Sequence, residues 1–168
     1  MLIDLQTLSK GPRSFDFVGS AEELDLLDIE MTRHGVVQTS CVATLTGGTL
    51  FVEGLVFFQA TMECCRCLKE FPVHLRIPFR RLFQKRAQDQ RADDDDEIEW
   101  IARDTLSVNL KPTIREAVIL EIPMKPLCSE GCIGFCPHCG QDLNKGSCGC
   151  HTEEVDPRWE PLRNLMNV

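Results

Sequence analysis

The chain has 168 residues, 43% of them hydrophobic, which is enough to bury the core of one ordinary domain. Its 26 acidic and 18 basic residues give a net charge of −8, whereas duplex-binding domains usually carry a basic excess. No apolar run approaches the roughly 20 residues that span a bilayer, and the first residues lack the basic start of a signal peptide. The sequence therefore predicts a cytoplasmic protein with no membrane among its partners.

Charge is distributed unevenly along the chain. Residues 64–91 contain eight basic residues and two acidic ones, so the remaining residues carry −14. Such segregation predicts one basic surface on an otherwise acidic molecule. The simplest interpretation of the basic stretch is a solvated face that pairs with the acidic residues after it.

Strand patterns occupy the middle of the chain. Before them, up to about Asp28, turn residues mix with a weak helix signal and allow no assignment. From His34 on, β-branched residues, a turn signal at Thr46–Gly48 and a second apolar run predict an antiparallel meander.

The clearest strand pattern follows at residues 71–80. Odd positions up to 79 are apolar and Arg76 and Arg80 stand at even positions, so this strand is predicted to have one buried and one basic face. Pro72 and Pro78 also fall on the even side, which predicts an edge or bulged strand because proline cannot donate to a ladder.

The next segment is polar and then becomes helical. A stretch near residues 88–97 with four successive aspartates predicts a mobile acidic loop, because a calcium loop would need alternating ligands and a glycine turn. Residues 97–101 predict another short strand. Near residues 109–121, Asn109 as N-cap, Pro112 in the first turn and apolar residues at helical spacing predict one helix.

Eight of the ten cysteines occur in four close pairs. In a reducing compartment grouped thiols more often bind metal than form disulfides, and two pairs complete the tetrahedral sulfur shell of zinc. The segment 136–150 gives the strongest signal, since Gly140 permits the positive φ that points backbone amides at sulfur. One or two zinc ions are predicted, the first held by Cys136, Cys139, Cys148 and Cys150, the second by Cys64, Cys67, Cys128 and Cys132.

Individual ligands can be exchanged in this prediction. His138, His151 and Cys65 lie close enough in sequence to replace a neighbouring cysteine. Cys41 alternates with apolar neighbours and is predicted to be a core residue instead.

Three further interpretations of the cysteines stay open. Cys64 and Cys67 can be reduced thiols in a β-turn, or a redox pair beside basic residues, although a thioredoxin-type motif belongs in a βαβ setting that is missing here. Iron–sulfur ligation is the other alternative, although the spacing matches neither ferredoxin pattern.

Motifs of catalysis are missing from the sequence. It has no glycine-rich phosphate loop, no nucleophile elbow and no helix with paired histidines. A closed site of four sulfurs has no open position for water and so stabilises a fold rather than activating a substrate. We therefore predict no catalytic residues, no small-molecule substrate and a protein that is not an enzyme.

Together these patterns predict an α+β, mainly β fold. It is expected to be a small antiparallel barrel or sandwich with one helix and a cysteine-rich, zinc-stabilised C-terminal tail. Residues 1–125 are predicted to form the β domain with the acidic loop and the helix, and residues 126–168 the zinc-binding tail packed on it.

Three segments of the chain resemble one family. They are the motif at Cys64, Arg66, Cys67 and Leu68, the helix core of residues 114–123, and the tail from Leu127 to the Asp-Pro-Arg-Trp of residues 156–159. In this combination they resemble the YceD-like family, whose members are described as large ribosomal RNA subunit accumulation proteins of bacteria and plastids. The resemblance spans most of the chain after Gly35 and implies a non-enzymatic role in building or preserving large-subunit (23S) ribosomal RNA.

The resemblance makes the basic stretch a candidate RNA contact. Structured RNA is bound largely through its phosphates and its shape. Aromatic platforms for stacking on unpaired bases are scarce, with Phe83 and Trp159 as the candidates. The residues predicted to contact ribosomal RNA or a pre-ribosomal particle are Arg66, Arg76, Arg80, Arg81, Lys85 and Arg86. The alternative is an acidic protein-interaction module that holds a basic ribosomal protein.

Overall fold

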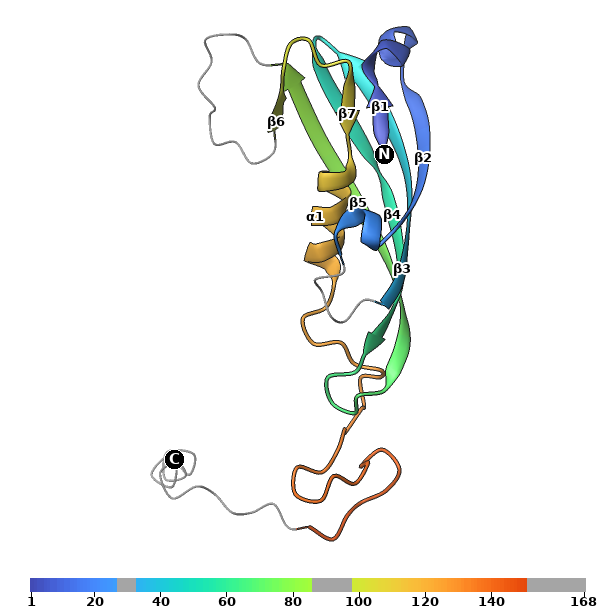
Figure 1. Cartoon of the computed structure of the whole chain (residues 1–168), viewed down its shortest axis with the longest axis vertical. Coiled ribbons are helices and arrows are strands. Elements are labelled where there is room, and N and C mark those ends of the chain that lie inside the picture. The colour runs from blue at the N-terminus through green and yellow to red at the C-terminus, as the bar shows by residue number, and fades with distance from the viewer. Residues whose placement is uncertain (27–32, 86–97, 151–168) are drawn as a thin grey trace, which may run out of the picture.

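The computed structural model describes residues 1–26, 33–85 and 98–150. Its strands and helices are β1 (Leu2–Asp4), η1 (Leu5–Lys10), β2 (Arg13–Ser20), η2 (Glu22–Leu24), β3 (Arg33–Thr46), β4 (Thr49–Glu63), β5 (Glu70–Lys85), β6 (Ile98–Ile101), β7 (Ser107–Asn109) and α1 (Lys111–Glu121). The long strands β3, β4 and β5 run along the length of an elongated molecule (Figure 1). The predicted acidic loop near residues 88–97 lies outside the described residues.

An open five-stranded sheet in the order β2-β3-β4-β5-β6 forms the body of the molecule, and β1 and β7 pair in a second, two-stranded sheet. The predicted meander is confirmed: β3 and β4 are joined at Gly47 and Gly48, whose φ values of 59° and 85° suit a tight two-residue hairpin turn. The mainly β class with one α-helix is therefore confirmed. The sheet does not close into a barrel, because β2 and β6 stand at opposite edges.

Strand β5 shows the alternation that the sequence predicts. Ile77 and Phe79 are buried in the core, whereas Arg76 before them and Arg80 after them are exposed. β5 pairs with β4 along its whole length but with β6 only from Leu82 onward, so most of β5 is an edge, as its prolines indicate. The predicted strand near residues 97–101 is present as β6, and it runs parallel to β5 rather than antiparallel.

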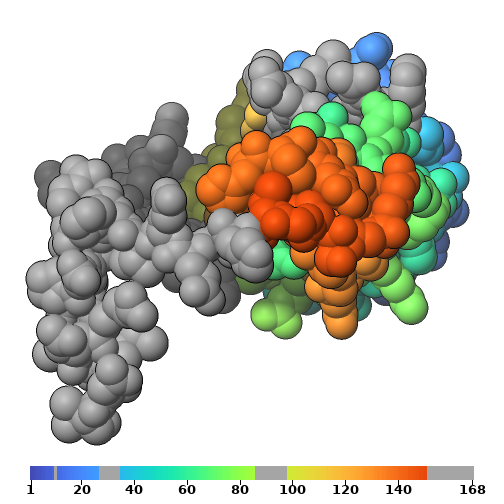
Figure 2. Space-filling view, turned by 90° about the horizontal axis from the view of Figure 1, so that it is seen from below, coloured from blue at the N-terminus to red at the C-terminus, as the bar shows by residue number. Residues whose placement is uncertain are grey.

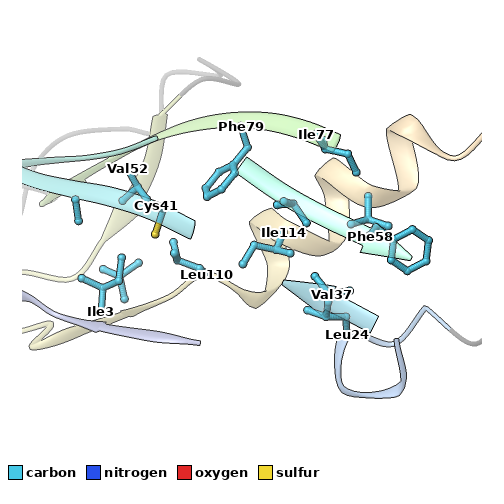
Figure 3. Packing of buried hydrophobic residues seen from close by; sticks show 14 of the residues in the cluster. Ile3, Leu24, Val37, Cys41, Val52, Phe58, Ile77, Phe79, Leu110 and Ile114 are labelled. Carbon is cyan, nitrogen blue, oxygen red and sulfur yellow. The ribbon is translucent and has the colours of Figure 1, made fainter. Parts of the chain in front are cut away.

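The core lies between one face of the five-stranded sheet and a layer made of α1, η1 and the β1–β7 pair. Figure 3 shows Leu110 and Ile114 opposite Phe79 and Phe58. These side chains belong to one continuous cluster, to which Ile3 of β1 also contributes. Alternate residues of β3, β4 and β5 point into this cluster, and within the described part of the chain no second core packs on the other face of the sheet.

Helix α1 confirms the predicted helix with a shift at its start. The first helical residue is Lys111, and Leu110 occupies the N-cap position. Asn109, the predicted N-cap, still performs part of that role, because its Oδ1 accepts a hydrogen bond from Lys111 N at 3.1 Å. Among the described residues, no helix is long and apolar enough to cross a membrane.

The C-terminal tail begins where α1 ends. It runs down to the turn between β4 and β5 and forms a compact loop structure at that end of the molecule (Figure 1). Here a second, small buried cluster contains Cys64, Cys67 and Cys132, separate from the main core. The division into two domains between residues 125 and 126 stays a prediction.

Candidate metal centre and nucleic-acid interface

The β4–β5 turn presents two thiols on one side. Cys64 N donates to Lys69 O at 3.0 Å and Leu68 N donates to Cys64 O at 2.9 Å, which closes a tight turn. Leu68 adopts a positive φ of 55° to complete it. Both Cys64 and Cys67 are buried as a result, although they lie in a connection between strands.

The tail brings two more thiols to this turn. The sulfur atoms of Cys64, Cys67, Cys128 and Cys132, called here the first group, all lie within 4.8 Å of one another. Cys64 Sγ is 3.8 Å from Cys132 Sγ, and Cys67 Sγ is 3.6 Å from Cys128 Sγ. Four sulfurs at about 2.3 Å from one zinc ion lie about 3.8 Å apart, whereas a disulfide needs about 2 Å. The donor set and its spacing therefore fit a tetrahedral metal ion.

Hydrogen bonds hold the tail against the turn independently of the sulfurs. Cys65 N donates to Pro126 O at 2.9 Å, and the Arg66 guanidinium donates to Cys132 O at 2.6 Å. Phe135 N in turn donates to Arg66 O at 3.3 Å. Seen from that end, the tail spreads across the tip of the sheet (Figure 2).

Glycine is required where tail and turn approach most closely. Gly134 has a φ of 86°, and a Cβ built on it would lie 2.6 Å from Arg66 O. An ordinary C···O contact is about 3.3 Å or longer, so a side chain here would push the tail away from the turn.

A second group forms within the tail itself. It consists of Cys136, Cys139, Cys148 and Cys150, whose sulfur atoms also lie within 4.8 Å of one another. Gly140 has the positive φ expected from the sequence, 73°, and its N–H donates to Cys136 O at 2.9 Å. Cys136 N donates to Gln141 O at 2.8 Å, which folds the segment after Cys139 back onto the first thiol. The two groups thus contain the same eight cysteines, in the same sets, as the sequence analysis proposes.

Backbone amides prepare one thiol in each group for metal binding. The N–H groups of Cys139 and His138 point at the Cys136 sulfur and lower its pKa to about 6. Burial opposes ionisation of Cys64, but N–H groups of its own turn and of Cys128 outweigh burial and lower its pKa to about 6. Because metals bind the thiolate, each group has one ligand that is ready at neutral pH.

The other thiols of the first group stay protonated in the absence of metal. Burial raises the pKa of Cys132, and contact with the Cys67 sulfur together with burial raises that of Cys128. The backbone of Lys69 favours the Cys67 thiolate, but burial and the neighbouring sulfurs outweigh it, so the pKa of Cys67 is raised as well.

The predicted substitute ligands are not part of either group. His138 and Cys65 are exposed and absent from both sets among the described residues, and His151 lies outside those residues. Cys41 is a core residue, as predicted, and burial raises its pKa to about 11.

The basic residues divide between two faces of the sheet. Arg76 and Arg80 of β5 are exposed on the face away from the core, called here the outer face. Phe57 and Phe51 of β4 are 38% and 44% exposed on the same face, and Arg76 Cζ lies 5.9 Å from the centroid of the Phe57 ring. The exposed outer-face residues include Val36, Gln38, Ser40, Val42, Phe51, Glu53, Phe57, Gln59, Pro72, His74, Arg76, Pro78 and Arg80, and β2 adds Ser14, Asp16 and Val18.

The other predicted RNA-binding residues point elsewhere. Arg81 faces α1 and forms an ion pair with Glu116. Lys85 Nζ donates to Arg103 O at 3.1 Å, and Arg66 is bound to the tail. Arg86 lies outside the described residues. Among the described members of the predicted set, only Arg76 and Arg80 share the outer face.

The aromatic platforms differ from the prediction. Phe83 is wholly buried in the core, so its prediction as a stacking platform is wrong. Trp159 lies outside the described residues. Phe51 and Phe57 are exposed aromatic residues of the outer face that the sequence analysis missed. Their signal is weak because apolar residues occur on both sides of β4 at these positions, as in Val56, Phe57 and Phe58.

Comparisons with known proteins place most of the chain in one family. Residues 52–166 match the family described as Large ribosomal RNA subunit accumulation protein YceD. An uncharacterized protein of Mycobacterium tuberculosis is 31% identical over 99% of this chain and 81% of its own length. The uncharacterized protein YlbN of Bacillus subtilis is 27% identical over 98% of this chain and 94% of its own length.

A plant relative shares a shorter segment. The chloroplastic Large ribosomal RNA subunit accumulation protein YCED homolog 1 of Arabidopsis thaliana is 41% identical over 34% of this chain and 18% of its own length. No solved structure matches the chain significantly. Because the family match covers most of the sequence, including both cysteine groups and β5, the chain belongs to the YceD family of large ribosomal RNA subunit accumulation proteins.

Proposed function

We propose that this chain is a non-enzymatic factor that supports the accumulation of large-subunit ribosomal RNA by binding that RNA or a pre-ribosomal particle. The family description supports the biological role. The observation that carries direct RNA binding is the pairing of an exposed arginine with an exposed aromatic ring, Arg76 over Phe57, on the outer face.

The chemistry of this face suits unpaired RNA. Guanidinium groups pair with phosphates, and aromatic rings stack on bases whatever their sequence. Phe57 and Phe51 are six residues apart on one strand, a span of about 20 Å at the rise of a β-strand. The outer face therefore offers two stacking positions with Arg76 and Arg80 on the strand alongside.

The two cysteine groups are proposed to hold zinc in a structural role. A four-sulfur shell leaves no coordination position for water or substrate, so the ion supplies folding energy and clips the tail to the β4–β5 turn. Elemental analysis with native mass spectrometry of the untagged protein tests this directly. Two zinc ions per chain are expected, and iron or no metal would refute the proposal.

Charge reversal on the outer face tests the RNA contact. Arg76→Glu with Arg80→Glu should abolish crosslinking to ribosomal RNA, because both phosphate-binding groups become repulsive. Arg13→Glu with Arg103→Glu is the matched control, since both residues are exposed outside the outer face and the change in net charge is identical. Arg81 is left intact in both, because its ion pair with Glu116 belongs to the fold.

The outcome also decides between the two modes of action. If both double variants crosslink to RNA like the wild type, the outer face is not the RNA contact. If RNA crosslinking is absent in the wild type while a basic ribosomal protein co-purifies with both variants, the chain is an acidic protein-interaction module instead.

A further inference from the structure

The loop of the second cysteine group reaches into the first group through one side chain. Asn144 lies between Cys139 and Cys148, yet its Nδ2 lies 3.6 Å from Cys132 Sγ and donates to it. Its Oδ1 accepts a hydrogen bond from Ile133 N at 2.9 Å, immediately after that cysteine. Asn144 is thus bound to both the sulfur and the backbone of one ligand of the other group.

The orientation of the Asn144 amide is fixed by its partners. Ile133 N is a donor and requires the amide oxygen, while Asp142 Oδ1 is an acceptor and requires the nitrogen at 3.0 Å. Asp142 also accepts from Asn144 N at 3.0 Å, and its Oδ2 lies 3.4 Å from Lys145 Nζ. The hydrogen bond from Asn144 lowers the pKa of Asp142, so its carboxylate is an acceptor at neutral pH. The amide N–H is therefore directed at Cys132.

The loop that carries Asn144 is held in place by the second group. Its ends are ligand positions Cys139 and Cys148, and Leu143 N donates to Gly134 O at 2.9 Å to join the two groups. An isolated bridge between Phe135 and Asp142 adds to this connection. If the second group opens, the segment between Asn144 and Cys148 loses its sulfur anchor and keeps weaker contacts within the loop, such as Lys145 N to Asp142 O at 3.1 Å and the Gln141 side chain to Ser147 O at 3.4 Å.

We propose that Asn144 is a positioning residue through which the second cysteine group, once closed around its metal, strengthens metal binding by the first group. The inference rests on the proposed binding of zinc to both groups. Donors to metal-bound thiolates orient the ligand and offset its charge, and losing such a partner typically weakens metal affinity ten- to hundred-fold. The second group, built from 15 consecutive residues, can close first, and the first group then loads with positive cooperativity.

The test measures the affinity of each group separately in the full-length chain. Apo protein is equilibrated with Zn²⁺ at buffered free concentrations, and thiol alkylation mapped by peptide mass gives a midpoint for each group. For Asn144→Ala we expect the first-group midpoint to rise ten- to hundred-fold and the second-group midpoint to stay unchanged. Asn144→Asp should behave like Asn144→Ala, because it keeps an acceptor for Ile133 N but cannot donate to sulfur.

Gln141→Ala is the matched control. Gln141 is in the same loop, but its side chain donates to Ser147 O at 3.4 Å and does not reach the first group. It should leave the first-group midpoint at the wild-type value. A loss equal to that of Asn144→Ala would mean that loop folding in general, and not the donor to Cys132, is responsible.

A double-mutant cycle completes the test. Cys139→Ser with Cys150→Ser opens the second group and should weaken the first group by the same factor as Asn144→Ala, and combining all three changes should add nothing further. Fully additive losses, or an unchanged first group, would overturn the coupling. A wild-type chain that binds no Zn²⁺ would instead refute the proposed metal sites, and circular dichroism of every variant separates either result from unfolding.

Discussion

Gly134 offers the sharpest test of the close contact between the tail and the β4–β5 turn. The variant Gly134→Ala places a methyl group 2.6 Å from Arg66 O, about 0.7 Å inside an ordinary contact. Its positive φ adds a cost of about 1–2 kcal/mol for any residue with a Cβ. Gly140→Ala is the matched control, because Gly140 also has a positive φ but its Cβ would meet nothing within 4 Å.

The difference between the two variants isolates the steric contact. Relieving an overlap of this kind typically costs about 1–3 kcal/mol. If the first group moves away from the tail to relieve the overlap, its zinc affinity falls by a factor that is roughly 5- to 150-fold larger than the loss at the second group in Gly140→Ala.

The assay is the buffered Zn²⁺ titration with each group read separately by alkylation, together with the thermal midpoint of each holoprotein. Expected results are a large loss at the first group for Gly134→Ala and a small loss at the second group for Gly140→Ala. Equal losses in the two variants would refute the reasoning, because the φ penalty alone would then explain both.

Four other outcomes are expected. Phe57→Ala should weaken single-stranded RNA binding by about 1–3 kcal/mol with little effect on stability. Phe58 is its buried neighbour, and Phe58→Ala should lower the free energy of unfolding by about 3–5 kcal/mol. Filter binding measures the first effect and urea unfolding the second. Gly54→Ala places a Cβ 2.3 Å from Ser40 O in the centre of the sheet and should lower the free energy of unfolding by about 1–3 kcal/mol. Gly131→Ala should leave it unchanged, because a Cβ there meets open space. Equal urea midpoints for the two variants would contradict this. Chelation of zinc should remove hydrogen-exchange protection from the tail and the β4–β5 turn but leave β3 and β4 protected, since the thiol cluster is separate from the core; loss of protection throughout the sheet would be the contrary result. In Cys139→Ser with Cys150→Ser, zinc uptake by the first group at pH 7 should release about three protons, because Cys64 is the one thiol of that group with a lowered pKa. The number of protons should rise toward four as the pH falls below about 6, and an indicator titration in weak buffer measures it. A constant four would show that Cys64 is not ionised beforehand.

Local sequence patterns predict the parts of the fold whose causes are local. The period of two in β5 fixes which of its residues are buried, and consecutive glycines at 47 and 48 define the hairpin between β3 and β4. The eight paired cysteines are likewise found by spacing alone, because chelation by two neighbouring thiols is a property of a short turn.

Other features depend on contacts between distant segments and leave no local signal. The parallel pairing of β6 with the end of β5 is a contact between separate strands, and its direction is not encoded in the four residues of β6. Arg81 belongs to a basic run in the sequence, but its partner Glu116 is 35 positions away. Asn144 is an ordinary loop asparagine until the fold places Cys132 beside it.

The first cysteine group also has a consequence for how the protein is made. Cys67 and its neighbour Cys128 are 61 positions apart in the chain. At 5–20 residues per second, a ribosome takes roughly 3–12 s to synthesise the segment between them. During that interval the front pair of thiols has emerged without its partners, so the clip closes only after β5 and α1 have been synthesised. The order of translation therefore lets this centre join its two pairs of thiols only after the strand and the helix between them exist.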